Sequence, residues 1–271
     1  MATPRNFSVI KAFAVLRAFQ NPNEGLTTSE LGKRANLPEA SAYRLIQTLE
    51  DVGALVRGQK GRYHPGLLLL SLSQNVTPNE LLRDASRRHM AELAQNLQLT
   101  IHLGVFEDGM VTYIEKVTAP GTFPIHTRVG AQLEAYCSGL GKILLAAKPD
   151  EDIERFIQEG ALIPLTPYTI TSATRLREEL ATVRRCGFAI DDRENKIDMR
   201  CIAVPVLDST GRTMAALSAS DEAERMDQVR QQRIRHALQD AAAQLRKKLF
   251  PLPAALPATG IRIQESSALL N

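Results

Sequence analysis

Residues 26–57 read LTTSELGKRANLPEASAYRLIQTLEDVGALVR, and this stretch decides the fold of the N-terminal part of the chain. A short helix is predicted over 28–35, with Thr28 or Ser29 capping its N-terminus. Asn36 follows, where a left-handed residue suits a tight turn. The stretch therefore predicts a short helix that ends in a sharp turn.

A longer helix is predicted to begin at Pro38, because proline is tolerated at the first helical position, where its missing N–H would have no partner. Its apolar side chains recur every three or four residues and so share one buried face: Ala42, Leu45, Ile46 and Leu49. Gly53 ends this helix, and two short strands at 54–57 and 62–64 flank a basic, glycine-rich tip. With a further helix over 7–19, this order is the plan of a winged helix-turn-helix.

Positive charge is concentrated in the same part. Residues 1–65 hold nine Lys and Arg against five Asp and Glu, so the net charge of +3 for the whole chain leaves −1 for the rest. A polyanion is the partner that such a distribution favours. The candidate DNA-contacting residues are polar residues of the two helices and basic residues of the hairpin: Thr28, Ser29, Glu39, Ser41, Tyr43, Arg44, Gln47, Arg57, Lys60 and Arg62.

Two other interpretations of this pattern stay open. Helix pairs with a tight turn also occur in structural bundles, and a winged helix can serve as a protein-interaction module that binds no DNA. The basic hairpin argues against both, because Arg57, Lys60 and Arg62 suit phosphate or minor-groove contacts.

Composition excludes several other classes. The three cysteines, Cys137, Cys186 and Cys201, are odd in number and widely spaced, which argues against a disulfide framework or a zinc site. We expect a cytoplasmic protein, because the sequence carries no secretory h-region and no apolar stretch of the roughly 18 residues that span a membrane. No cofactor and no metal are expected.

The middle of the chain reads as a linker. An apolar segment at 66–76 and an amphipathic helix over 79–97 are predicted to pack on the hairpin or on a second copy of the chain, so we expect dimerisation there. The expected organisation is a DNA-binding domain over 1–65, a linker over 66–97, a third part over 98–250 and a flexible tail over 251–271.

The pattern changes after residue 98. Strands are predicted at 99–107, 110–117, 124–129, 188–191, 201–207 and 213–219, and helices at 139–147, 150–158, 173–186 and 226–249. Asp108-Gly109 is a strong hairpin signal between the first two strands. Hairpins flanked by helices predict an α+β domain with an antiparallel sheet.

The chain resembles the IclR family of bacterial transcriptional regulators over about residues 6–250. The resemblance rests on the opening stretch together with GRYHPGLLLLSL at 61–72, YCSGLGKILLA at 136–146, GFAIDDREN at 187–195 and RCIAVPVLDSTGRTMAALSAS at 200–220. It implies a winged-helix domain joined to a GAF-like effector-binding domain, in a dimer or dimer of dimers. It also implies a repressor that binds a double-stranded DNA operator of a catabolic operon and responds to a small carboxylate or aromatic acid; an activator is the alternative.

The effector pocket that the resemblance implies falls on Leu133, Gly139, Leu140, Asp191, Cys201, Ser218 and Ser220. The residues support a carboxylate there, because a helix start offers unpaired N–H groups and a positive dipole end. Gly139 and Gly141 would let a ligand approach the backbone, and Ser138, Ser218 and Ser220 could add hydroxyl donors.

Asp191 has two possible roles. A carboxylate beside a bound carboxylate repels it unless one is protonated or a donor lies between them. Asp191 therefore meets a hydroxyl, amino or keto-hydrate group of the effector, or it caps neighbouring backbone and never meets the effector.

A thiol-dependent enzyme is the rival function, since Cys137 and Cys201 flank the expected pocket. No nucleophile–base pair accompanies them, so we expect no enzyme and no catalytic residue. His102 and His126 are expected to be hydrogen-bonded structural residues rather than metal ligands.

Overall fold

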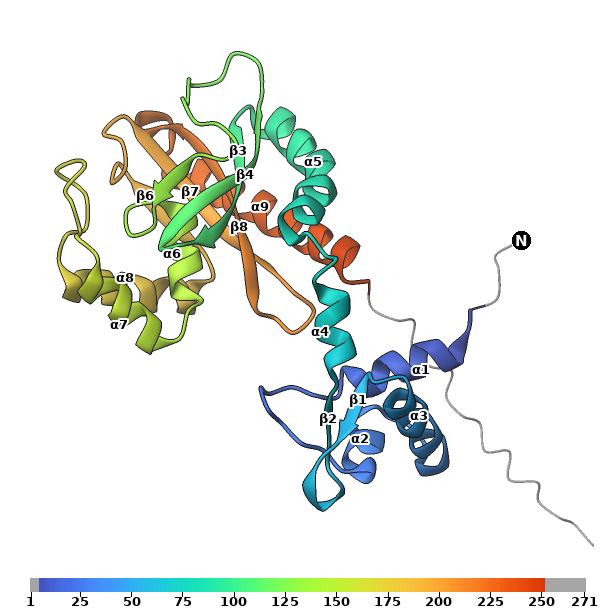
Figure 1. The fold of residues 1–271 in the computed structure, drawn as a ribbon. Helices are drawn as coiled ribbons and strands as arrows, with labels where there is room; N and C mark the ends of the chain where they lie inside the picture. The colour runs from blue at the N-terminus through green and yellow to red at the C-terminus, as the bar shows by residue number, and fades with distance from the viewer. Residues whose placement is uncertain (1–4, 252–271) are drawn as a thin grey trace, which may run out of the picture. The chain divides into compact units, whose positions relative to one another are not determined.

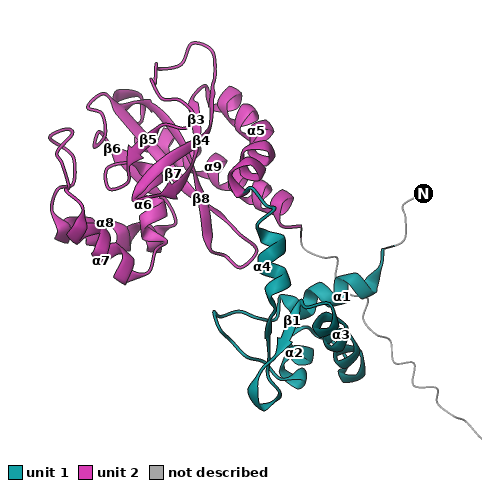
Figure 2. Ribbon diagram, viewed as in Figure 1, with its two compact units in different colours: residues 1–77, 252–271 teal, residues 78–251 magenta. Residues whose placement is uncertain are grey.

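The computed structural model describes residues 5–251 (Figure 1). Within this range the chain divides into two compact units, with the boundary between Thr77 and Pro78 (Figure 2). Apart from Pro251, the tail predicted at 251–271 lies outside the described residues.

Unit 1 contains the predicted winged helix-turn-helix. Its elements are α1 (Phe7–Leu16), α2 (Thr28–Arg34), α3 (Glu39–Asp51), β1 (Leu55–Arg57), the single turn η1 (Gln59–Gly61), β2 (Tyr63–Pro65) and α4 (Leu67–Ser73). Asn36 and Gly53 adopt the positive φ of +53° and +76° that the turns require. Leu31, Ile46 and Leu55 are fully buried in its core.

The predicted cap of α2 is wrong by one residue. Thr27, and neither Thr28 nor Ser29, is the N-cap: its Oγ1 accepts from the Glu30 N–H at 3.3 Å, and the Glu30 carboxylate accepts from the Thr27 N–H at 2.8 Å. The helix begins at Thr28, and the cap falls on Thr27 because Thr27 and Glu30 have the spacing of a capping box. α1 is also shorter than predicted, since its last turn tightens with a bond from the Ala18 N–H to the Val15 carbonyl.

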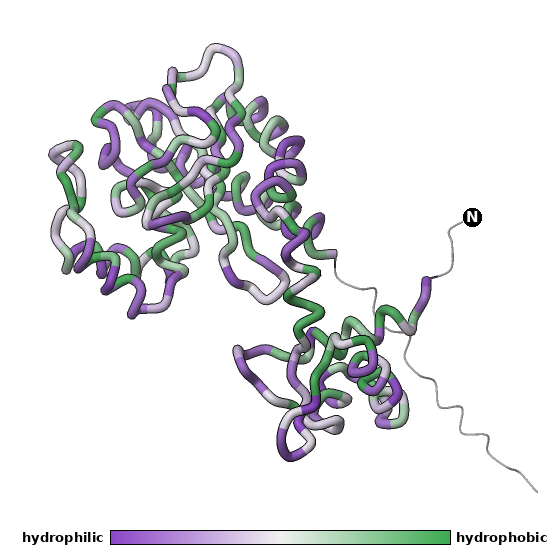
Figure 3. Tube along the Cα trace, in the orientation of Figure 1, coloured by the Kyte–Doolittle hydropathy of each residue, from purple (hydrophilic) through white to green (hydrophobic). Residues whose placement is uncertain are grey.

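Unit 1 exposes a row of leucines on α4, the helix that is mainly green in Figure 3. Leu67 is 81% exposed, Leu70 60% and Leu72 56%. α1 likewise leaves Phe7 and Phe13 exposed.

Unit 2 is an antiparallel sheet of six strands in the order β5-β4-β3-β8-β7-β6. The strands are β3 (Thr100–Glu107), β4 (Met110–Thr118), β5 (Gln132–Glu134), β6 (Ala189–Asp192), β7 (Met199–Leu207) and β8 (Thr213–Glu222). The other elements are α5 (Pro78–Leu97), α6 (Gly139–Ala146), α7 (Asp150–Glu159), α8 (Ala173–Cys186), η2 (Ala223–Arg225) and α9 (Gln228–Leu249). The predicted α+β class is confirmed, and Asp108 and Gly109 form the predicted turn with φ of +49° and +81°.

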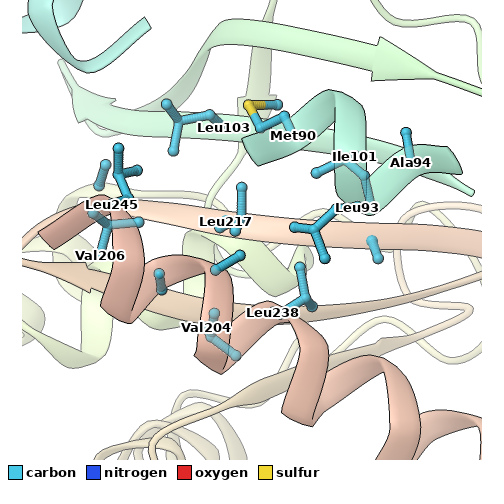
Figure 4. Close-up of a cluster of buried hydrophobic side chains, with 14 of the residues drawn as sticks. Met90, Leu93, Ala94, Ile101, Leu103, Val204, Val206, Leu217, Leu238 and Leu245 are labelled. Carbon is cyan, nitrogen blue, oxygen red and sulfur yellow. The ribbon is translucent and has the colours of Figure 1, made fainter. Parts of the chain in front are cut away.

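The two faces of the sheet differ. α5 and α9 cover one face, where Figure 4 shows Met90 and Leu238 meeting Leu217 of β8 in an apolar core. α6, with α7 and α8, covers the other face, where Ala203 and Ala216 join a second core. Successive residues of a strand point to opposite faces, so β8 supplies both sides at once.

The strand predicted at 124–129 is wrong. This segment is irregular, because the Lys116 ammonium donates to the carbonyls of Ile125 at 2.6 Å and Thr127 at 2.9 Å. A side chain thus takes two of the acceptors that a strand would offer to a neighbour. The short strand β5 follows it and pairs with β4.

Candidate effector pocket and DNA-contacting surface

A cavity lies in unit 2 between the sheet and the start of α6. All eight residues predicted for effector binding line it: Leu133, Ser138, Gly139, Leu140, Asp191, Cys201, Ser218 and Ser220. Its other lining residues were not predicted: His102, Tyr113, Ile125, His126, Thr127, Asn195, Lys196 and Met199.

Strand register explains why residues far apart in the chain meet here. Asp191 pairs with Cys201, and Cys201 pairs with Ser220, so three neighbouring strands place these side chains in one row. His102 and Ser218 form the next row. Both rows point to the α6 face, because their members are two residues apart along β3 or β8.

The Ser138 hydroxyl is already used by the fold. Its Oγ accepts from the Gly141 N–H at 3.1 Å and donates to the Glu134 carbonyl at 2.9 Å. A hydroxyl has one proton to donate, so Ser138 acts as the cap of α6. Gly139 and Leu140 line the cavity, and their N–H groups, in the first turn of α6, have no acceptor within the helix.

The two glycines of α6 serve close packing. A Cβ on Gly141 would lie 2.1 Å from the Ala135 carbonyl oxygen, a separation that no side chain tolerates. A Cβ on Gly139 would lie 3.3 Å from the Cys201 sulfur. The helix start therefore sits directly against the preceding loop and β7.

Asp191 both caps backbone and lines the cavity. It is 1% exposed, and its Oδ1 accepts from the Glu194 N–H at 2.8 Å and the Asn195 N–H at 3.3 Å. Burial, together with the neighbouring Glu194 carboxyl, raises the pKa of Asp191 to about 7. A substantial fraction of this side chain is therefore protonated near neutral pH and can donate a hydrogen bond.

A buried ion cluster holds this loop, and sequence reasoning missed it. The Lys142 ammonium, 1% exposed, donates to Glu194 at 2.5 Å, to Glu179 at 2.9 Å and to the Ile190 carbonyl at 2.5 Å. Burial raises the pKa of Glu194 as well. A lysine amid the apolar residues of a short helix was the available signal, because a buried cation needs an acidic partner.

His102 and Tyr113 add aromatic polar groups to the cavity. The His102 Nε2 lies 2.7 Å from the Thr127 Oγ1, and its ring centroid lies 4.8 Å from that of Tyr113. Burial and the charge of Lys116 lower the pKa of His102 to about 3, so the ring is neutral. The expected structural hydrogen bond is present, and the residue lines the pocket in addition.

The cysteines do not have the chemistry of a nucleophile. Burial raises the pKa of Cys137 and of Cys201 to about 12, so both remain protonated thiols. Among the residues that the structure describes, no group of three His, Cys, Asp or Glu side chains is disposed to hold a metal ion. Within residues 5–251 there is also no helix long and apolar enough to cross a membrane.

Helix α3 carries five of the residues predicted for DNA contact, and three of them are exposed. Glu39, Tyr43 and Arg44 are exposed, whereas Ser41 is half-buried. Gln47 faces inward: its amide donates to Glu50 at 3.3 Å and to the Tyr63 hydroxyl at 3.2 Å.

On α2, Ser29 is exposed and Thr28 half-buried. The hairpin residues Arg57 and Lys60 are exposed. Arg62 instead donates to the Gly25 carbonyl at 2.6 Å and lies 3.3 Å from the Glu30 carboxylate, which ties the hairpin to α2. Arg62 and Gln47 thus each have partners within unit 1, whereas no side-chain hydrogen bond is seen for Tyr43, Arg44 or Lys60 among the described residues.

Comparisons with known proteins agree on one family. Residues 8–58 match the model of the IclR helix-turn-helix domain, and residues 74–247 match that of the bacterial transcriptional regulator IclR C-terminal domain. The chain is 32% identical over 241 residues to the HTH-type transcriptional regulator KdgR of Escherichia coli (strain K12), covering 88% of this chain and 90% of KdgR.

Solved structures give the same result. The Thermotoga maritima IclR structure matches with a TM-score of 0.60 and 28% identity, covering 90% of this chain and 98% of that one. An IclR homolog from Microbacterium hydrocarbonoxydans complexed with 4-hydroxybenzoate matches with a TM-score of 0.59 and 27% identity, covering 89% and 98%. The chain therefore belongs to the IclR family of bacterial transcriptional regulators, with a helix-turn-helix domain followed by an effector-binding domain.

Proposed function

We propose that this protein represses a catabolic operon by binding its operator as a dimer or dimer of dimers, and that a small carboxylate or aromatic acid in the unit 2 cavity controls it. The observation that carries the effector part is the cavity itself. It combines a helix start, two serines on one strand and an aspartic acid whose pKa lies near 7.

The chemistry of the cavity favours an acid that also carries a hydroxyl or keto group. The first-turn N–H groups of α6 and the positive end of its dipole suit a carboxylate. Ser218 and Ser220 offer hydroxyls from the sheet, and protonated Asp191 offers a donor where an ionised one would repel the anion. The 4-hydroxybenzoate held by the Microbacterium homolog is an acid of this kind.

DNA contact is proposed for the exposed side chains of unit 1. Arg44 on α3 would meet a guanine edge or a phosphate, and Arg57 and Lys60 would meet phosphates or the minor groove; all three side chains are exposed. The exposed leucines of α4 are proposed to pack against a second copy. The domain limits we propose are 1–65 for the DNA-binding domain, 66–97 for the linker and 98–250 for the effector domain.

A gel shift with the DNA upstream of the chain's own gene tests operator binding. We expect retardation above that of random DNA at about 0.1 M salt, where non-specific contacts weaken. Arg44→Ala should remove the preference, whereas Arg175→Ala, on α8 of unit 2, should not. Equal affinity for both DNAs would refute the proposal.

A thermal-shift series tests the effector class, because a ligand that binds only the folded state raises stability. The probes are 4-hydroxybenzoate, benzoate, lactate and pyruvate. Ser218→Ala should weaken the response, and Ser209→Ala, on the β7–β8 turn, serves as the matched control. A response to none of the acids would contradict the class. A reporter fused to the bound promoter, with and without the gene for this protein, separates repression from activation.

A further inference from the structure

A second groove lies at the outer edge of the unit 2 sheet, between β6, β7 and the first turns of α9. Its apolar residues are Ile190 of β6, Ile202 of β7 and Phe188, which directly precedes β6. Ile190 and Ile202 alternate with Asp191 and Cys201 along their strands, so the groove lies on the sheet face opposite the effector cavity. The two sites share no lining residue.

One guanidinium in this groove has no anionic partner. Arg235 lies over the Phe188 ring at 4.7 Å from the ring centroid, and within residues 5–251 it makes no hydrogen bond or ion pair; its Nε is buried without an acceptor. Two nearby arginines are paired: Arg200 with an aspartate at 2.6 Å and Arg230 with another at 2.7 Å. Arg235 is therefore a cation fixed in place by stacking with its hydrogen-bonding capacity unused.

The remaining walls are neutral. Gln228, Gln231 and Gln232 follow at helical spacing on the same side of α9 as Arg235, and the Gln231 amide donates to the Met226 carbonyl at 2.8 Å. No Asp or Glu lines the groove. Amide donors and one cation thus stand on one wall, opposite an apolar wall supplied by the strands.

We propose that this groove is a second small-molecule site, which takes a carboxylate attached to a short branched or alicyclic hydrocarbon. The carboxylate pairs with Arg235 and accepts from a glutamine amide, and the hydrocarbon rests on Ile190 and Ile202. Charge-assisted bonds of this type are the strong ones in proteins. This site goes beyond the proposed function and does not depend on it.

The absence of tryptophan from the chain gives a direct test. Phe188→Trp places a single indole at the groove and keeps an aromatic ring under Arg235, since tryptophan is the best partner for a cation. The probe is cyclohexanecarboxylate, titrated into the full chain while the tryptophan emission is recorded. Cyclohexylmethanol, which has the same ring and no charge, is the control ligand.

We expect a saturable change of emission with the acid and none with the alcohol. Adding Arg235→Gln should weaken the apparent affinity by about tenfold or more, the cost of losing a charge-assisted bond. Arg233→Gln, an exposed position on the same helix, should leave it unchanged. Absence of saturation, or equal affinities for the two arginine variants, would overturn the proposal.

Equilibrium dialysis compares Arg235→Gln with the otherwise native chain without the introduced tryptophan. Labelled cyclohexanecarboxylate should occupy one site fewer per chain in Arg235→Gln than in the otherwise native chain. Equal occupancy would overturn the second site. Because the effector cavity lies on the other face, a chain that fails to bind an effector there can still pass both tests.

Discussion

Asp191→Asn removes a carboxyl whose ionisation the folded protein resists. The pKa of Asp191 is raised from the ordinary 3.8 to about 7, mainly by burial and then by Glu194. The difference is about three pH units, each worth about 1.4 kcal/mol between the two protonation states. Ionised Asp191 therefore costs the folded state about 4 kcal/mol. Asparagine keeps an oxygen that accepts from the Glu194 and Asn195 N–H groups.

The pH dependence of the free energy of unfolding follows from whether the folded or the unfolded state ionises at the lower pH. Below about pH 4 the carboxyl is protonated in both states, and its contribution to stability is fully present. Between about pH 4 and pH 7 only the unfolded chain ionises, so the wild-type protein loses stability as the pH rises. Above about pH 7 both states are ionised and the loss is complete. Asparagine has no such titration.

Urea unfolding followed by circular dichroism at a series of pH values measures this effect. The free energy of unfolding of Asp191→Asn minus that of the wild type should grow by about 4 kcal/mol between about pH 4 and pH 8. Asp192→Asn, at the half-buried neighbour bound to Arg200, is the matched control. A difference that stays flat with pH, or that matches the control, would refute the proposed burial of a neutral acid.

Other variants test other parts of the structure. Lys142→Met leaves the buried Glu194 carboxylate without its cation and should lower the free energy of unfolding by about 3–5 kcal/mol in urea titrations; a loss below about 1 kcal/mol would contradict the ion cluster. Thr27→Ala should cost about 1 kcal/mol by losing the cap of α2, whereas Ser29→Ala should cost almost nothing, and equal costs would restore the original cap assignment. Gly141→Ala puts a Cβ 2.1 Å from a backbone oxygen and should abolish cooperative thermal unfolding of unit 2; a normal melting curve would count against that packing. Arg57→Gln should lower the slope of log K against log salt for DNA binding by about one, and an unchanged slope would remove it from the contact surface.

Most helices and strands could be predicted from the sequence, because the residues that determine each of them are close together in the chain. The apolar spacing of α3, the caps of α6 and α8 and the turn at Asp108-Gly109 are all set by neighbours in the sequence. The segment at 124–129 failed for the opposite reason. Its irregular backbone depends on Lys116, a side chain from another strand that no local pattern connects with it.

The residues of the candidate site likewise fall into those that the sequence predicted and those that it did not. All the positions that the resemblance implied line the cavity, because a family motif occupies the same place in the fold of each member. His102, Thr127 and Asn195 were missed, because they enter through strand register and loop geometry rather than through a motif. The role of Lys142 was also hidden, since its partners Glu179 and Glu194 lie 37 and 52 residues away in the chain.

Four consecutive residues of strand β8 alternate between the apolar core and the cavity. Leu217 and Ala219 are held by the apolar core under α5 and α9, whereas Ser218 and Ser220 face the cavity. A substitution at an even-numbered position here alters what the cavity can recognise and leaves the core composition untouched. Insertion of one residue would exchange the two sets and bring hydroxyls into the core. Under the proposed function, point substitutions along this strand would change ligand preference, whereas a change in its length would disrupt the core.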